Sequence, residues 1–163
     1  MVVRYALEVA RTPKAYSPRQ ERLGSAVLRW ASAANAWVYR ASKGRIAGRF
    51  GKGIPICLLT TRGRRSGKER TVALLYLRDG ADFVVVASKG GMSHHPEWYL
   101  NLVAEPSVRV EVGKDVLACT ARTATDDEKR SLWPRLIAMY ASYGTYQART
   151  TREIPVVICT PVG

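Results

Sequence analysis

The segment from Ile56 to Ser88 constrains the fold more than any other part of the chain. It contains three apolar runs in succession, which cover Ile56 to Thr61, Thr71 to Leu77 and Asp82 to Ser88. Short apolar runs separated by turn residues are typical of consecutive strands, and Asp79-Gly80 supplies such a turn between the second and third runs. The segment therefore predicts three strands that are antiparallel where short turns join them.

The turn between the first two runs is strongly basic. It reads Arg62-Gly63-Arg64-Arg65-Ser66-Gly67-Lys68-Glu69-Arg70 and holds five cations. Glycines allow backbone N–H groups to approach a phosphate, and arginines can bind one through two hydrogen bonds. We therefore expect a phosphate site here. Its residues would be Arg64, Arg65, Ser66, Gly67 and Arg70. The alternative is a solvated basic hairpin tip.

Several other chemistries are not indicated. The interval from Gly63 to Gly67 is one residue too short for a Walker A loop, and Glu69 stands where Ser or Thr would bind magnesium. The chain has no nucleophile elbow, no His-Glu-x-x-His and no dinucleotide-binding glycine motif. His94 and His95 are adjacent, so their side chains would point in different directions, which favours a cap or surface role over a metal site.

The net charge of +13 is unevenly distributed along the chain. Residues 1–70 hold 16 Lys and Arg against 3 Asp and Glu, whereas residues 71–163 hold 10 of each kind. The excess therefore lies in the N-terminal part and the basic turn. This distribution implies a polyanionic partner, which could be a nucleic acid, an anionic membrane surface or a multiply charged cofactor.

Cysteine use and hydropathy indicate the compartment. No run reaches the roughly 18 uninterrupted apolar residues that a membrane-spanning helix needs, and the first residues lack a signal-peptide pattern. Cys57, Cys119 and Cys159 lie far apart in apolar runs, so neither a disulfide framework nor a CxxC metal site is expected. A reducing cytoplasm is the expected location.

The N-terminal third contains one long periodic segment. Residues 1–20 include Pro13 and Pro18 and show no sustained period, so we expect a loose arm there. In residues 21–42, apolar side chains then recur at intervals of three or four. They are Leu23, Val27, Trp30, Ala34, Trp37, Val38 and Ala41. This spacing predicts an amphipathic helix whose stripe either faces the core or lies in a membrane interface. A basic linker completes residues 21–53, and residues 54–163 form the main domain.

The C-terminal half predicts further short elements. Residues 108–112 and 116–122 form an expected hairpin, and the acidic start at residues 125–128 is typical of a helix N-terminus. Pro134 is expected either to kink that helix or to shift its start, and residues 154–159 are expected to form the last strand. About six mainly antiparallel strands with three helices predict an α+β protein built on a small barrel or half-barrel.

Three tyrosines recur late in the chain. Tyr140, Tyr143 and Tyr146 are spaced by three residues across an expected helix end near Gly144. This spacing gathers their hydroxyl groups, which could line a pocket and donate hydrogen bonds or protons to a planar substrate. The alternative is that all three are ordinary packing residues.

Together, these residues resemble the deazaflavin-dependent nitroreductase family of split β-barrel proteins. The matching motifs follow the family's order across residues 36–161. They are Leu59-Thr60-Thr61-x-Gly63-Arg64-x-Ser66-Gly67, Val86-Ala87-Ser88-Lys89-Gly90-Gly91, His95-Pro96-x-Trp98-Tyr99-x-Asn101-Leu102, Tyr143-x-x-Tyr146-Gln147 and Thr151-Arg152-x-Ile154-Pro155-Val156.

The resemblance implies the cofactor coenzyme F-420, an 8-hydroxy-5-deazaflavin that ends in a phosphodiester and a polyglutamate tail. The basic turn would bind the phosphate, and the linker cations would bind the tail. These cations are Lys43, Arg45, Arg49 and Lys52. The resemblance places the ring system against the strand end, which would be closed on one side by aromatic and amide side chains. The ring-contacting residues would be Ala87, Ser88, Lys89, Gly90, Gly91, Trp98, Tyr99 and Asn101.

The resemblance also implies the reaction. Reduced coenzyme F-420 would donate a hydride to a quinone or a nitroaromatic compound, and the protein would orient the two partners. Ser88, Tyr140, Tyr143 and Tyr146 would hold the acceptor. We further expect a cytoplasmic protein with possible peripheral contact to an anionic membrane.

Two other functions remain open from the sequence. A nucleic-acid-binding barrel would use the same arginines on phosphates, but it would be expected to spread its cations along a groove, and residues 71–163 are charge-neutral. An FMN-binding split-barrel oxidoreductase also needs a phosphate site. A polyglutamate tail explains the surplus of cations in the linker better than FMN does.

Overall fold

The computed structural model describes residues 13–163 except residues 43, 46–47 and 52. Within the first helix it describes the backbone throughout, but not the side chains of residues 25–35 and 37. Several expectations therefore lie outside the described residues. They concern residues 1–12 of the arm, the linker cations Lys43 and Lys52, and the side chains of Val27, Trp30, Ala34 and Trp37.

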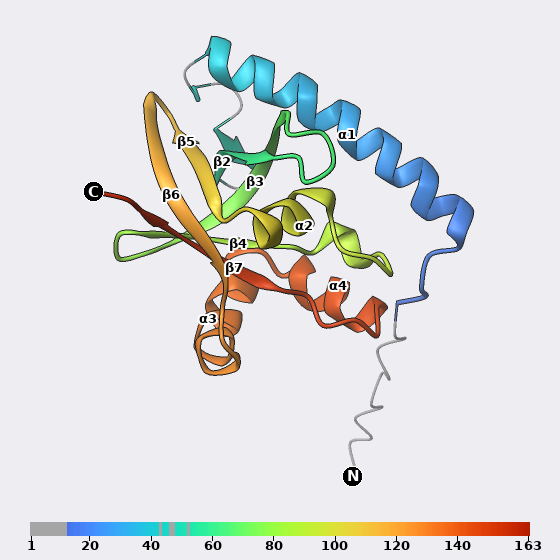
Figure 1. The fold of residues 1–163 in the computed structure, drawn as a ribbon. Helices are drawn as coiled ribbons and strands as arrows, with labels where there is room; N and C mark the ends of the chain where they lie inside the picture. Colours follow the sequence, from blue (N-terminus) through green and yellow to red (C-terminus); the bar gives the residue numbers. More distant parts are fainter. Residues whose placement is uncertain (1–12, 43, 46–47, 52) are drawn as a thin grey trace.

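Six antiparallel strands form the barrel (Figure 1). They are β2 (Ile54–Arg62), β3 (Glu69–Asp79), β4 (Asp82–Val86), β5 (Ser107–Val112), β6 (Asp115–Thr123) and β7 (Val156–Pro161). Their order is β2-β3-β4-β7-β6-β5, and pairing of β2 with β5 closes the sheet. The short strand β1 (Arg49–Phe50) pairs with the start of β2. The expected α+β split barrel is confirmed, with β1 as an addition to the six strands.

Strand β4 has both faces buried. Phe83 and Val85 pack in the barrel interior, whereas Val84 and Val86 pack against the C-terminal helices. Successive side chains of a strand point to opposite faces, so a strand covered on both sides is apolar at every position. The strand consequently ends deep inside the protein, where Ala87 is 0% exposed.

Helix α1 (Pro18–Ala41) begins earlier than the periodicity predicted. Ser17 and Gln20 form a capping box: the Ser17 N–H donates to Gln20 Oε1 at 2.8 Å, and the Ser17 hydroxyl accepts the Gln20 N–H at 3.4 Å. Pro18 then occupies the first helical position, where its missing N–H costs no hydrogen bond. Residues 18–20 are therefore helical, and their assignment to a loose arm was wrong.

Helix α1 contacts the barrel through residues that do not belong to the predicted apolar stripe. Ala36 and Tyr39 are 6% and 1% exposed, and the Tyr39 hydroxyl accepts the Gly113 N–H at 2.8 Å. Leu23 is 73% exposed and Ala41 is also exposed. At about 3.6 residues per turn, both lie on the opposite side of the helix from Tyr39. These two stripe residues therefore face away from the barrel.

The remaining helices pack around the barrel (Figure 1). They are η1 (Lys89–Gly91), a single turn of 3₁₀ helix, and α2 (Glu97–Ala104), α3 (Asp126–Met139) and α4 (Ser142–Arg149). Helix α3 runs through Pro134 and ends before Tyr140, which has an extended backbone with φ −145°. The expected helix end near Gly144 is therefore wrong, because Gly144 lies inside α4. Among the described residues, no helix is long and apolar enough to cross a membrane.

Candidate functional site

The basic turn, residues 62–70, is a tight connection between β2 and β3. The Gly63 N–H donates to Lys68 O at 2.8 Å, and the Gly67 N–H donates to Gly63 O at 2.7 Å. Gly67 has φ +65°, a conformation that glycine adopts without strain. The side chains of Arg65, Ser66 and Arg70 are exposed around this turn. The sequence-predicted phosphate residues are thus held together on one rigid loop.

Arg64 differs from the other arginines of the turn because protein groups already bind it. Its backbone N–H and its Nη1 both donate to Asn101 Oδ1 at 3.2 Å, and Nη1 donates to Glu97 Oε2 at 2.7 Å. Asn101 is 4% exposed, and its Nδ2 donates to Thr61 Oγ1 at 3.3 Å. The structure therefore gives Asn101 the role of fastening α2 to the basic turn.

The chain leaves β4 through the strand-exit loop, residues 87–92, in an unusual conformation. Lys89, Gly90 and Gly91 all have positive φ, at 46°, 66° and 78°. A Cβ atom on Gly91 would lie 2.6 Å from the carbonyl oxygen of Tyr146, so only glycine fits at this contact with α4. The end of the strand-exit loop therefore packs directly against the α4 backbone at Tyr146.

A residue that sequence reasoning did not assign to the site holds this loop. Arg152 donates from Nη2 to Ser88 O at 2.8 Å and to Ala87 O at 3.3 Å, and from Nε to Met92 O at 2.8 Å. Its Nη1 lies 3.3 Å from Nδ1 of His95. Burial lowers the pKa of Arg152, and the charge of Glu21 acts in the opposite direction. Its place in the last family motif was the signal in the sequence.

The hydroxyl groups of Tyr140 and Tyr146, the tyrosine pair, lie 3.2 Å apart. Burial and this hydrogen bond raise the pKa of Tyr146 to about 12, so its hydroxyl keeps its proton at neutral pH. Tyr143 is 4% exposed and packs with Leu132 and Leu136 of α3. The predicted gathering of hydroxyls is thus present for two of the three tyrosines, and Tyr143 lies mainly in the core.

The two aromatic residues of α2 differ in burial. Trp98 is 7% exposed and packs in the barrel core. Tyr99 is partly exposed: its hydroxyl lies 3.0 Å from Thr123 Oγ1, and its ring lies 5.0 Å from that of His95. Of the two, Tyr99 therefore has the more accessible ring.

Glu97 connects the two halves of the site. Its hydrogen bond with Arg64 lowers the pKa of its carboxyl group, and the charges of Arg64, Arg65 and Lys89 act in the same direction against the opposing effect of burial. Lys89 belongs to the strand-exit loop, whereas both arginines belong to the basic turn. The charges of both segments therefore act on one carboxylate, which contacts Arg64 directly.

Two segments N-terminal to the barrel complete the surroundings. The carboxylate of Glu21 in α1 accepts the Ser93 N–H at 2.7 Å and the Ser93 hydroxyl at 2.8 Å, and it lies 3.2 Å from His94 Nδ1. Phe50 of β1 contacts Tyr140 edge-to-face, with ring centroids 5.9 Å apart. Helix α1 and the linker therefore both reach the site.

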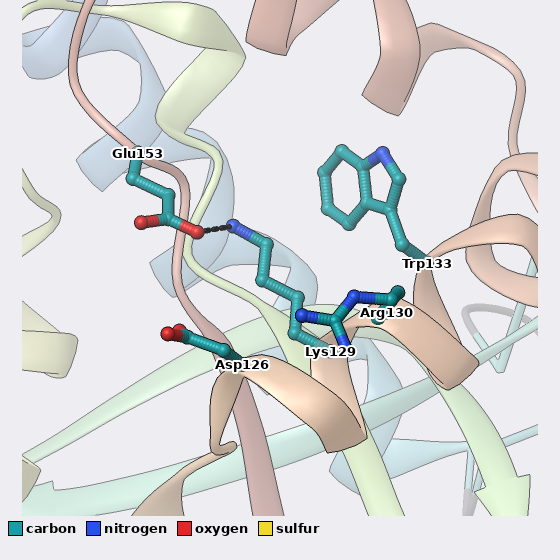
Figure 2. Close-up of a pocket in the computed structure, with 5 residues that line it drawn as sticks. All are labelled: Asp126, Lys129, Arg130, Trp133 and Glu153. Atoms are coloured by element: carbon teal, nitrogen blue, oxygen red, sulfur yellow. Dashed lines mark hydrogen bonds and ion pairs between the residues drawn. The ribbon is translucent and has the colours of Figure 1, made fainter.

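Other parts of the structure offer weaker candidates. Figure 2 shows an open hollow on α3 where Lys129 pairs with Glu153. Lys129 Nζ lies 2.7 Å from Glu153 Oε1, and it also donates to Ile154 O. None of the predicted site residues lines it. In the described part of the chain, no three His, Cys, Asp or Glu side chains gather at metal-binding distance.

Comparisons with known proteins agree on one family. The model of a family described as F420H(2)-dependent quinone reductase matches residues 31–161. The chain is similar to the F420H(2)-dependent quinone reductase Rv1261c of Mycobacterium tuberculosis. The two are 40% identical over 126 residues, which cover 76% of this chain and 85% of the relative.

Solved structures give the same result. One described as an F420-H2 dependent reductase (FDR-A) is 42% identical, with a TM-score of 0.60, and the match covers 64% of this chain and 93% of that chain. Another, described as a domain-swapped dimer, is 38% identical with a TM-score of 0.61. That match covers 77% of this chain and 98% of the other chain.

Proposed function

The chain belongs to the F420H(2)-dependent quinone reductase family, and we propose that its basic turn, strand-exit loop and tyrosine pair together form the reaction site. The cofactor is coenzyme F-420, as the resemblance implied. The observation that carries the site proposal is the 2.7 Å contact between Arg64 of the turn and Glu97, a carboxylate on which the charges of Arg65 and Lys89 also act. Cations from the turn and from the loop can thereby act on one anionic ligand.

The basic turn would bind the phosphodiester. Arg65 and Arg70 are exposed, and within the described part of the chain neither forms an ion pair. Ser66 lies beside them on the turn and offers a hydroxyl, whereas the Gly67 N–H is bonded to Gly63 O and Gly67 shapes the turn. Arg45 and Arg49 of the linker are also exposed and would bind tail carboxylates. The fit to a cofactor with several anionic groups is therefore good.

The strand-exit loop would carry the deazaflavin ring. Ser88 and Gly90 are partly exposed and have a small side chain or none, which leaves room beside them for a flat ligand, whereas Ala87 and Gly91 are buried beneath this surface. Arg152 fixes the carbonyl groups of Ala87 and Ser88 and so keeps this surface in one conformation. When bound, reduced coenzyme F-420 supplies the hydride.

The tyrosine pair would hold the acceptor. The two hydroxyl groups carry two protons. One proton forms the hydrogen bond between the tyrosines, and the other can form a hydrogen bond to a quinone oxygen. Ser88 lies on the neighbouring loop as a further donor. A donated hydrogen bond stabilises the negative charge that develops on the acceptor during hydride transfer. Quinones and nitroaromatic compounds both accumulate charge on such an oxygen.

Titration of the purified protein with coenzyme F-420 and with FMN tests this function. Tight binding of the deazaflavin and weak binding of FMN are expected. Each of the single variants R65A and R70A should weaken deazaflavin binding by about 1.5 to 3 kcal/mol, the scale of one charge-assisted hydrogen bond, and the double variant R65A/R70A should weaken it further. R130A, which removes an exposed arginine of α3, is the matched control. Unchanged affinity in the double variant would exclude the basic turn as the phosphate site.

We also propose that α1 associates peripherally with anionic membranes from the cytoplasmic side, which would give access to lipid-soluble quinones. Leu23 and Ala41 face away from the barrel, and Arg19 and Arg22 are exposed near the start of the helix. Sedimentation with anionic vesicles should recover more protein than sedimentation with neutral vesicles, and L23D should reduce this recovery. Equal recovery with both vesicle types would contradict the proposal.

A further inference from the structure

We propose that the Glu97 carboxylate is an internal stand-in for the anionic groups of coenzyme F-420. It neutralises part of the cation cluster in the free protein and leaves that cluster when a phosphodiester or tail carboxylate binds. The inference rests on the proposed function because it concerns the same cations. It identifies a residue outside the sequence-predicted set that lowers the affinity for the cofactor.

The geometry allows Glu97 to leave while Arg64 stays in place. The Glu97 side chain is 65% exposed, whereas that of Arg64 is 21% exposed. Arg64 has a second anchor, because Asn101 Oδ1 accepts both its backbone N–H and its Nη1. The ion pair between Glu97 and Arg64 is therefore partly open to water, which makes it weak, and breaking it does not release the turn.

The charges around Glu97 also come from more than one segment. Its carboxylate bonds Arg64 at 2.7 Å, and the charges of Arg65 and Lys89 act on it as well. An anionic ligand bound by these cations would lie close to the carboxylate, and two like charges in one site repel each other. The ligand therefore has to displace Glu97 or bind against its charge.

A simpler role for Glu97 is to stabilise α2, since it lies in the first helical turn, where an acid interacts favourably with the helix dipole. The two roles predict opposite consequences for binding. If Glu97 only supports the helix, removing its charge should lower the protein's affinity for the cofactor or leave it unchanged. If Glu97 is a stand-in anion, removing its charge should raise that affinity.

The test measures the affinity of E97Q for three ligands through the intrinsic fluorescence of the deazaflavin. The three ligands are the complete coenzyme, a form that ends at the phosphodiester, and the ring with its sugar-like chain but no phosphate. E97Q should bind the complete coenzyme about three- to tenfold more tightly, the effect of removing one nearby like charge near a partly exposed site. Binding of the phosphate-free ring should not change.

The matched control is D127N. Asp127 also lies in the first turn of a helix and pairs with an arginine, Arg130, but it belongs to α3. Both variants change the net charge of the protein equally. Any difference between their affinities for the coenzyme therefore results from the position of Glu97. E97A should reproduce the gain of E97Q, and thermal unfolding of each variant verifies the fold.

The outcomes are separable. A gain for both anionic ligands identifies the phosphodiester as the displacing group, and a gain for the complete coenzyme alone identifies the tail. Unchanged or weaker binding in E97Q, an equal gain in D127N, or an equal gain for the phosphate-free ring overturns the inference. Failure of the wild-type protein to bind the coenzyme would instead overturn the proposed function.

Discussion

At the scale of single residues, the tyrosine pair is the part of the site with the most direct chemistry. Because the pKa of Tyr146 is raised to about 12, its hydroxyl group remains a hydrogen-bond donor at every pH at which the protein would be assayed. Y146F retains the ring and removes that donor. Quinone turnover should then fall about tenfold or more, with unchanged affinity for coenzyme F-420.

Tyr143 provides the internal control for this experiment. It is 4% exposed, so Y143F changes a side chain that packs mainly against protein. Turnover by Y143F should stay close to that of the wild-type protein. An equal loss in both variants would mean that the hydroxyl groups act through packing of α4, and a loss of coenzyme affinity in Y146F would place Tyr146 in the ring pocket.

At the scale of elements, one guanidinium group binds three carbonyl groups of the strand-exit loop. Arg152 bonds the carbonyl groups of Ala87, Ser88 and Met92, which would otherwise lack these partners when the loop closes. R152Q should reduce the free energy of unfolding by about 1.5 to 3 kcal/mol, the scale of one or two hydrogen bonds to a charged group. Coenzyme affinity should fall with it, because the ring surface loses its fixed conformation.

The control for R152Q is R135Q, which removes an exposed arginine that pairs with Asp79. That variant should change stability by less than about 1 kcal/mol and leave coenzyme binding intact. Hydrogen exchange resolved to residues 87–92 distinguishes a loosened loop from general destabilisation. If R152Q binds the coenzyme as well as the wild-type protein does, Arg152 has no part in positioning the ring.

At the scale of the whole molecule, Glu21 connects α1 to the segment between the strand-exit loop and α2. Burial raises the pKa of its carboxyl group, but the bonds from Ser93 and the charge of His94 outweigh burial and leave the pKa below the usual value. A lowered pKa in the folded state means that the ionised form stabilises the fold. This stabilisation is present above the unfolded pKa, about 4.3 for glutamate, and is lost as the pH falls through the folded value.

E21Q tests this connection. At pH 7 its melting temperature should lie several degrees below that of the wild-type protein, since about 1 to 2 kcal/mol is expected from the lost contacts. The difference should shrink as the pH falls below about 4. E153Q, which breaks the exposed pair with Lys129, should show a much smaller difference at pH 7. A pH-independent difference in E21Q would mean that ionisation of Glu21 does not support α1.

The sequence determined the local elements because their causes lie within a few residues. The apolar runs before and after the basic turn predicted β2 and β3, and the turn itself brings Arg65, Ser66 and Arg70 together on one short connection. The three-residue spacing of the tyrosines placed Tyr140 near Tyr146. The family motifs, which record the same local patterns, were sufficient to identify the cofactor.

Contacts between residues distant in sequence were decided only by closure of the barrel. Arg152 reaches Met92 across 60 residues, Glu21 reaches Ser93 across 72, and Arg64 reaches Asn101 across 37. No periodicity spans such separations, so the spacing of residues indicated neither the loop anchor nor the acid that contacts the cations, although Arg152 belongs to a family motif. Likewise, helical spacing showed that α1 has an apolar stripe, but burial of Tyr39 and its hydrogen bond to Gly113 decided which face meets the barrel.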